Sequence, residues 1–377
     1  MRTRYFRHLF AVSAFALTAI TSAQASEIVI GQCAPLSGSL RATGKEIVAG
    51  ARAYFELVNA EGGIAGRKIR HVVKDDLYDT AETVRLTQQL IDNERAVGLI
   101  GYAGTGNVAE LLRQGVLSSR RVPLVAPFTG GEPLRKPYNP YVFHIRASYA
   151  DEVERLVEQF TLIGLKKIAV FYQNDAFGST VLSSVESALA RRELSLVARG
   201  SYEKGSEDVG AAVAAISRGA PQAVLMVAVM RPAAAFVREY RKLHPGTQIS
   251  GLSVISGSEF HAVAGTDSAR GIGITQVVPS PFNGSLKVVQ EYREAMRRHA
   301  PGMPFSHASF ESYLGARVMV EGLRRIKGEI NSAALLKALE GVDVDLGGHH
   351  VRFGPGDRVG SKFVEVTLLR DDGAMIR

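Results

Sequence analysis

Short apolar runs alternate with amphipathic stretches over residues 28–147, and this alternation is typical of βα units around a parallel sheet. Apolar residues between Ile47 and Val58 recur at helical spacing, which predicts a helix with one face on a core. The turn signal at residues 61–63 ends this helix. Asp79, with Glu82 three residues later, predicts the start of the next helix. Strands are expected at 28–32, 69–74, 96–101 and 122–126.

The same alternation starts again after residues 141–147. It predicts a second α/β lobe of the same design as the first. Strands are expected at 166–172, 194–199, 222–229 and 248–253, and helices at about 151–163, 178–192, 206–218 and 232–243.

The last hundred residues begin with an apolar run at 271–278 and a stiff connection, Pro279-Ser280-Pro281. Beyond it, residues 349–377 resemble strand pairs separated by turn signals at 354–357 and 371–373. Helices are expected between these regions at about 284–299, 307–327 and 331–340.

The N-terminus has the three-part layout of a secretory signal peptide. Arginines at positions 2, 4 and 7 precede an apolar run from Leu9 to Ile20, and Ala23-Gln24-Ala25 follows. The apolar run is too short to span a bilayer, which takes about 20 residues. We therefore expect residues 1–25 to be removed and the protein to be exported and soluble, with 352 of its 377 residues left. Loss of three arginines lowers the formal net charge from +8 to +5.

The single cysteine, Cys33, excludes a disulfide framework and any metal site built from cysteines. Residues 30–33 loosely imitate a lipidation motif, but Gln32 is too large before the modified cysteine and Glu27 interrupts the apolar run. We expect Cys33 to be a small buried apolar residue near a strand end.

Enzyme signatures are missing from the sequence: it contains no nucleophile elbow, zinc-binding helix motif, P-loop or dinucleotide fingerprint. His349 and His350 are read as solvated loop histidines rather than metal ligands. Lysine and arginine are scattered, so nucleic acid is excluded as a partner. We expect a protein that is not an enzyme and that has no cofactor and no metal.

The informative loops follow predicted strands, where open α/β sheets bind ligands. Residues 101–106 offer Tyr102, Gly104 and the Thr105 hydroxyl at a helix start, a small anion site suited to a carboxylate. Residues 127–131 repeat these features, with Phe128 and Thr129.

In the second lobe, Phe177 lies between a strand and a helix start. Its ring either stacks on a ligand or packs between the helix and the sheet as a core residue. Tyr149 lies just past the expected junction of the lobes, where it is a core residue or a ligand contact.

Several of these segments resemble type I periplasmic binding proteins of the leucine/isoleucine/valine-binding type, which serve bacterial ABC importers. The resemblance runs from about Glu27 to the C-terminus. It is carried by I-V-I-G-Q-C-A-P-L-S-G-S, N-A-E-G-G-I-A-G-R-K-I, K-D-D-L-Y-D, G-Y-A-G-T-G, V-P-L-V-A-P-F-T-G and I-A-V-F-Y-Q-N-D-A-F-G.

The resemblance implies an α/β fold of two doubly wound parallel-sheet lobes joined by three hinge crossings, with the ligand enclosed between them. It implies that lobe 1 comprises residues 26–146 and 278–349, and lobe 2 residues 147–277 and 350–377. The hinges are expected near 145–148, 276–280 and 349–352.

The resemblance also assigns candidate contacts. The family's carboxylate-binding hydroxyl falls on Thr105, and the loop after the fourth strand places Phe128, Thr129 and Gly130 nearby, with the register open by one residue. The family's tyrosine in lobe 2 falls on Phe177, a ligand-facing aromatic falls near Met230, and the acidic residue that holds an ammonium falls on Ser253.

Serine in place of that acid argues against free α-amino acids as ligands. An enclosed ammonium without an acidic partner weakens the binding free energy by about 3–5 kcal/mol. Glu259 or Asp175 would have to substitute for the missing acid. We therefore expect a periplasmic, monomeric binder of a small carboxylate-bearing solute, an amino acid or an organic or aromatic acid, that delivers it to a membrane permease. The alternatives are a dedicated branched-chain amino acid binder and a sensory module that presents its ligand to a membrane receptor.

Overall fold

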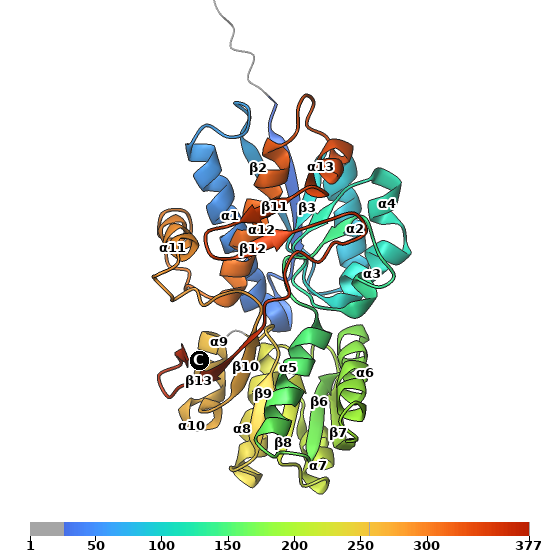
Figure 1. The fold of residues 1–377 in the computed structure, drawn as a ribbon, viewed down its shortest axis with the longest axis vertical. Helices are drawn as coiled ribbons and strands as arrows, with labels where there is room; N and C mark the ends of the chain where they lie inside the picture. Colours follow the sequence, from blue (N-terminus) through green and yellow to red (C-terminus); the bar gives the residue numbers. More distant parts are fainter. Residues whose placement is uncertain (1–25, 256, 377) are drawn as a thin grey trace, which may run out of the picture.

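Two α/β lobes lie one above the other in the computed structural model, which describes residues 26–255 and 257–376 (Figure 1). The predicted signal peptide, residues 1–25, lies outside the described residues. The predicted fold class, two lobes each built around a largely parallel sheet, is confirmed.

The upper lobe contains a five-stranded sheet in the order β2-β1-β3-β4-β5, and all of its strands run parallel. Strand β1 is buried along its whole length, as a central strand covered on both faces should be. Cys33 is fully buried near the end of β1, as predicted. The strands are β1 (Ile28–Ala34), β2 (Ile69–Asp75), β3 (Gly98–Ile100), β4 (Leu124–Val125) and β5 (Val142–Phe143).

Helices cover both faces of this sheet. One face packs on α1, α11, α12 and α13, and the other on α2, α3 and α4. The Asp79 side chain accepts a hydrogen bond from the Glu82 N–H at 2.9 Å, which confirms the predicted start of α2. The helices are η1 (Gly38–Leu40), α1 (Arg41–Ala60), α2 (Thr80–Asp92), α3 (Thr105–Arg113), α4 (Val116–Arg120), η2 (Glu132–Leu134), α11 (Lys287–His299), α12 (His307–Arg324) and α13 (Ser332–Leu339).

Helices α1 and α12 approach each other closely at Gly50. A Cβ atom at this position would lie 1.9 Å from the Ser309 carbonyl oxygen. Replacing Gly50 with alanine is expected to force the helices apart and to lower the free energy of unfolding by about 1–3 kcal/mol. Urea unfolding of this variant measures the effect.

Gly341→Ala is the matched control, because no heavy atom lies within 4 Å of a Cβ built there. Equal stability of the two variants would contradict the close-packing argument.

The lower lobe contains a seven-stranded sheet in the order β14-β13-β10-β9-β8-β6-β7. Strands β6 to β10 are parallel, and the last two strands of the chain extend the sheet as an antiparallel hairpin. The strands are β6 (Ile168–Gln173), β7 (Leu196–Tyr202), β8 (Ala223–Val227), β9 (Gln248–Gly251), β10 (Gly273–Gln276), β13 (Glu365–Leu369) and β14 (Met375–Ile376).

Helices α5 and α6 cover one face of the lower sheet, and α7 to α10 pack on the other. Two short helices, α9 and α10, were not predicted from the sequence. The lower-lobe helices are α5 (Tyr149–Leu162), α6 (Ala176–Ala190), α7 (Gly210–Arg218), α8 (Met230–Leu243), α9 (Gly257–Ala264) and α10 (Thr266–Ala269).

The chain passes between the lobes after β5, after β10 and before β13. The third passage differs from the sequence-based boundary at 349–352. Strand β12 (His350–Arg352) pairs with β11 (Asp343–Asp345) on the upper lobe. Residues 358–360 lie beside the first passage, where the His144 N–H donates to the Arg358 carbonyl at 2.8 Å and the Gly360 N–H to the His144 carbonyl at 2.7 Å. These backbone bonds hold the chain on the upper lobe to about residue 360.

Two smaller predictions need correction. His349 is buried rather than solvated, whereas His350 is exposed on β12. The turn at 354–357 does not join a strand pair of the C-terminal region, because β12 pairs with the preceding β11. The turn at 371–373 does connect β13 and β14, as predicted. Among the described residues, no helix has the length and apolar character needed to cross a membrane.

Candidate functional site

A small pocket lies between the lobes, and its walls come from both of them. Its volume is about 20 Å³, room for little more than one water molecule. The lobes are therefore closed on each other in this structure. The upper lobe contributes Leu40, Tyr78, Gly104, Thr105 and Phe128, and the lower lobe Tyr149, Phe177, Val229 and Val254.

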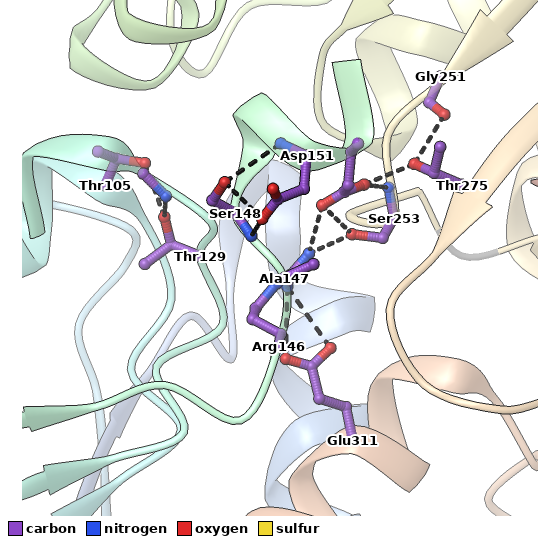
Figure 2. A network of polar contacts seen from close by, with 12 residues as sticks. Thr105, Thr129, Arg146, Ala147, Ser148, Asp151, Gly251, Ser253, Thr275 and Glu311 are labelled. Atoms are coloured by element: carbon purple, nitrogen blue, oxygen red, sulfur yellow. Dashed lines mark hydrogen bonds and ion pairs between the residues drawn. The ribbon is translucent and has the colours of Figure 1, made fainter. Parts of the chain in front are cut away.

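One wall of the pocket contains the Thr105 hydroxyl, and the Thr129 hydroxyl lies directly behind it. Thr105 is the first residue of α3, and Thr129 follows β4 in the neighbouring loop. Their Oγ1 atoms lie 2.7 Å apart, and Thr129 Oγ1 also accepts a hydrogen bond from the Gly131 N–H at 3.2 Å (Figure 2). A helix N-terminus and a hydroxyl pair provide donors for an anion.

Gly104 allows this approach of helix and loop. Its φ is +99°, a conformation that favours glycine, and a Cβ atom there would lie 2.7 Å from both Asn107 Oδ1 and a ring carbon of Tyr78.

Four aromatic rings and three aliphatic side chains form the rest of the pocket wall. The rings of Tyr149 and Phe177 have centroids 5.1 Å apart, and Phe128 and Tyr78 are also buried. Burial raises the pKa of Tyr149 and of Tyr78, so both phenols are neutral and remain hydrogen-bond donors. The pocket thus combines an apolar, aromatic interior with hydroxyl donors.

The structure brings five of the nine sequence-predicted residues to the pocket wall: Gly104, Thr105, Phe128, Tyr149 and Phe177. Thr129 lies next to the wall through its bond to Thr105. Tyr102 is buried in the upper core, where its hydroxyl accepts from Thr87 at 3.1 Å. Met230 is buried in the lower core.

Sequence reasoning missed Leu40, Tyr78, Val229 and Val254. Val229 and Val254 lie one position away from the candidates Met230 and Ser253, and a shift of one residue changes the direction of an extended side chain. Tyr78 lies within the K-D-D-L-Y-D segment that carries the family resemblance, but no local pattern showed where its ring points.

A buried polar network lies behind the pocket and connects the lobes. Arg146, on the first passage between the lobes, is fully buried at its centre, and Figure 2 shows it between Glu311 and Ser253. Arg146 Nη2 donates to Glu152 Oε1 on α5 at 3.1 Å and also bonds to the Ser253 hydroxyl. Arg146 Nη1 lies 3.4 Å from Glu311 Oε1 on α12. One arginine thus links an acid of each lobe.

The two acids in the network have different surroundings. Glu152 accepts further bonds from the Ser253 N–H at 2.9 Å, the Ser253 hydroxyl at 3.0 Å and the Thr275 hydroxyl at 2.5 Å. Glu311 has only the long contacts to Arg146 within the described residues. Burial therefore dominates, and it raises the pKa of Glu311 to about 7.

The network also supports the pocket wall. The Arg146 guanidinium carbon lies 5.2 Å from the centroid of the Phe128 ring and 5.6 Å from that of Tyr149. Both distances are within the range of cation–π attraction. The arginine that links the lobes therefore also fixes two aromatic rings of the pocket.

None of the nine wall residues of the described chain is charged. The acids considered as substitutes at Ser253 do not reach the pocket. Asp175 caps α6, accepting from the Phe177 N–H at 2.9 Å and the Gly178 N–H at 3.1 Å. Glu259 lies instead near Lys45 and Pro304, in a separate groove.

Contacts at the edge of the pocket hold the lobes together. Lys204 of the lower lobe lies 4.0 Å from the centroid of the Tyr78 ring and donates to Asn107 Oδ1 at 3.3 Å. Gln173 Nε2 lies 3.4 Å from the Tyr78 hydroxyl. Among the described residues, no group of three or more histidine, cysteine, aspartate or glutamate side chains is arranged to hold a metal ion.

Comparisons with known proteins agree with this architecture. The sequence model of the periplasmic binding protein family matches residues 27–374. A crystal structure of a substrate-binding periplasmic protein from Ralstonia solanacearum has 35% sequence identity and a TM-score of 0.89, covering 93% of this chain and 99% of that one. A possible leucine/isoleucine/valine-binding protein from Rhodopirellula baltica SH 1 has 28% identity and a TM-score of 0.89, covering 95% and 98%. Leu/Ile/Val-binding protein homolog 7 of Brucella melitensis is 26% identical, over 92% of this chain and 89% of that protein.

Proposed function

The chain belongs to the periplasmic binding protein family, and from this premise we propose that it captures a small carboxylate-bearing solute for an ABC importer. The solute binds in the pocket between the lobes, and the closed protein delivers it to a membrane permease. The predicted signal peptide supports export to the periplasm.

The observation that carries this proposal is the make-up of the pocket. Thr105 and Thr129 supply hydroxyl donors at the N-terminus of α3, and uncharged, mostly aromatic side chains supply the other walls. Hydrogen bonds to a charged group contribute about 1.5–3 kcal/mol each, so two or three of them support micromolar binding. The pocket favours an anion with an apolar body.

The second candidate function, a branched-chain amino acid binder, rests on the names of the relatives. An α-amino acid brings an ammonium group that needs an acidic partner. The buried acid Glu152, on the same helix as Tyr149, already accepts hydrogen bonds from Arg146 and from three other donors. An enclosed ammonium without a partner costs about 3–5 kcal/mol, which favours simple carboxylic acids.

Entry of the solute requires the lobes to separate, because the closed pocket holds only about 20 Å³. The passages between the lobes are the expected hinges, and closure on the solute produces the form presented to the permease.

A thermal-shift panel on the mature protein, with leucine, isoleucine, valine and matched carboxylic acids that lack the amino group, identifies the solute class. A ligand at about 100 times its Kd stabilises the folded state by about 2.7 kcal/mol. We expect the largest shift from a carboxylic acid. A larger shift from any of the three amino acids would contradict the argument from Ser253.

Replacing Thr105 with valine removes the hydroxyl and keeps the shape of the side chain. The affinity for the best ligand of the panel is expected to fall about 10- to 150-fold, since a charge-assisted hydrogen bond is lost. Calorimetric titration measures the change.

Thr161→Val, at the opposite end of α5 from the pocket, is the matched control and should bind as the unmodified protein does. Unchanged affinity of Thr105→Val would remove the carboxylate site from the proposal.

A further inference from the structure

A second and larger cavity lies between the lobes. Its volume is about 330 Å³, compared with about 20 Å³ for the pocket described above. This volume is at the lower end of the range for small-molecule sites. The upper lobe contributes Phe305 and the start of α12, and the lower lobe Ile255 and the hairpin between β13 and β14.

The cavity wall contains a buried histidine, His307. His307 is 7% exposed, and within the described part of the chain neither of its ring nitrogens is bonded. Burial lowers its pKa to about 3, so the imidazole is neutral, with one donor and one acceptor available. Buried polar groups in folded proteins almost always have partners, so an unpaired imidazole in a cavity wall points to a ligand.

The same wall carries free backbone donors. His307 and Ala308 are the first two residues of α12, an 18-residue helix, and the first N–H groups of a helix have no partner within it. The N-cap Ser306 hydroxyl is already used by the Ser309 N–H at 3.1 Å. These donors and the helix dipole favour a negatively charged or strongly accepting group beside the imidazole.

The remaining walls are mainly apolar. Ile255, Phe282, Phe305 and Met375 surround the space, and the His307 and Phe282 rings lie with centroids 6.5 Å apart, edge to face. Asp372 at the rim is held by the Ala374 N–H at 3.0 Å and by Arg370 at 3.2 Å, so its charge is compensated. The cavity therefore suits a compact apolar or aromatic body.

We propose that this cavity is a second ligand site, distinct from the solute pocket, for a compact organic acid with an aromatic or branched apolar body. Its carboxylate lies against His307 and the start of α12, and its body contacts Phe282, Phe305 and Met375. Because both lobes form the walls, an occupant stabilises the closed arrangement. Ala308 lines this cavity and belongs to the same apolar core cluster as Phe128 and Val254 of the solute pocket.

The two sites are cooperative, because a ligand at either site favours the same closed arrangement of the lobes. A ligand that favours the closed form at one site raises the affinity at the other by the same factor. The second site thus tunes solute affinity, and this consequence alone rests on the proposed function of the first pocket.

Calorimetric titration with phenylacetate, on the mature protein and four variants, tests the site. His307→Leu removes the hydrogen-bonding ring and keeps an apolar wall, and Ala374→Phe fills the cavity from the other lobe. Both are expected to weaken phenylacetate binding at least about tenfold, which corresponds to about 1.4 kcal/mol. Thr105→Val, in the solute pocket, should not weaken the binding event that both cavity variants weaken, and it should weaken only an event that both of them retain.

His350→Gln is the matched control, because His350 is exposed on β12 and does not line this cavity. Retained phenylacetate binding in both cavity variants, or its loss in Thr105→Val alone, would overturn the proposal by placing the ligand in the solute pocket. No binding to the unmodified protein up to about 10 mM would overturn it as well. Failure of the solute proposal shows separately, as unchanged solute affinity in Thr105→Val.

Discussion

Replacing Arg146 with methionine is expected to lower the free energy of unfolding by about 3–5 kcal/mol. Arg146 is fully buried and is the cation between Glu152 and Glu311. Methionine fills much of the same volume, but it removes the cation that bonds to both buried acids. Removing one member of a buried ionic group is costly, because the remaining charges stay desolvated.

Chemical unfolding at neutral pH measures this loss, with Arg155→Met as the matched control. Arg155 pairs with Glu158 at 2.8 Å on the exposed face of α5, where such pairs contribute at most about 1 kcal/mol. Adding Glu152→Gln and Glu311→Gln to Arg146→Met should recover part of the stability, since no buried charge then remains in the network. A loss no larger than that of the control would show that Arg146 does not hold the lobes together electrostatically.

The second large effect is expected in the pH dependence of stability. The pKa of Glu311 rises from its ordinary 4.5 to about 7, mainly through burial, with Glu152 adding to the rise and Arg146 and Arg135 opposing it. Between these values the folded protein holds a proton on Glu311 that the unfolded chain has released. Stability contributed by this residue is therefore complete below about pH 4.5 and is lost as the pH rises to about 7.

Glu311→Gln removes this titration. The free energy of unfolding of the unmodified protein should fall relative to the variant by at most about 1.4 kcal/mol per pH unit across that window. Comparing the two proteins cancels the opposite trend from buried histidines such as His71, whose pKa is lowered to about 3.

Glu158→Gln, on the exposed face of α5, is the control and should follow the unmodified protein at every pH. Parallel profiles for Glu311→Gln and the unmodified protein would mean that Glu311 has an ordinary pKa in the fold.

The two network predictions also bear on solute capture. Arg146 contacts the rings of Phe128 and Tyr149, so its removal changes the pocket as well as the stability. The acids that it joins come from α5 of the lower lobe and α12 of the upper lobe. The same buried group thus contributes both to the contact between the lobes and to the shape of the pocket.

Much of the architecture was predictable because it depends on local signals. The apolar runs of β1 and β8 are typical of buried strands. The spacing of apolar residues between Ile47 and Val58 is that of a helix face. Asp79, with Glu82 three residues later, is typical of a helix start. The third passage between the lobes was placed too early, because only pairing in space, between His144 and residues 358–360, keeps that segment on the upper lobe.

The candidate site was also predictable only in part. Gly104 and Thr105 follow a strand and open a helix, an arrangement visible in the sequence, and the structure places them in the pocket wall. The sequence predicted Met230 and Ser253 as pocket residues, whereas their chain neighbours Val229 and Val254 line the pocket. The side that an extended residue faces depends on the register at the end of its strand, and the sequence alone did not show this register.

By itself, the sequence determined the two α/β lobes, the order of most of their elements and the loops that meet between them, because periodicity, caps and turns act between residues close in the chain. Only the tertiary structure decided the buried group of Arg146, Glu152 and Glu311, and the position of His307 in a cavity wall without a hydrogen-bond partner among the described residues. Those side chains lie far apart in the sequence, and both their charges and their hydrogen bonds depend on which neighbours folding brings around them and how much water it removes.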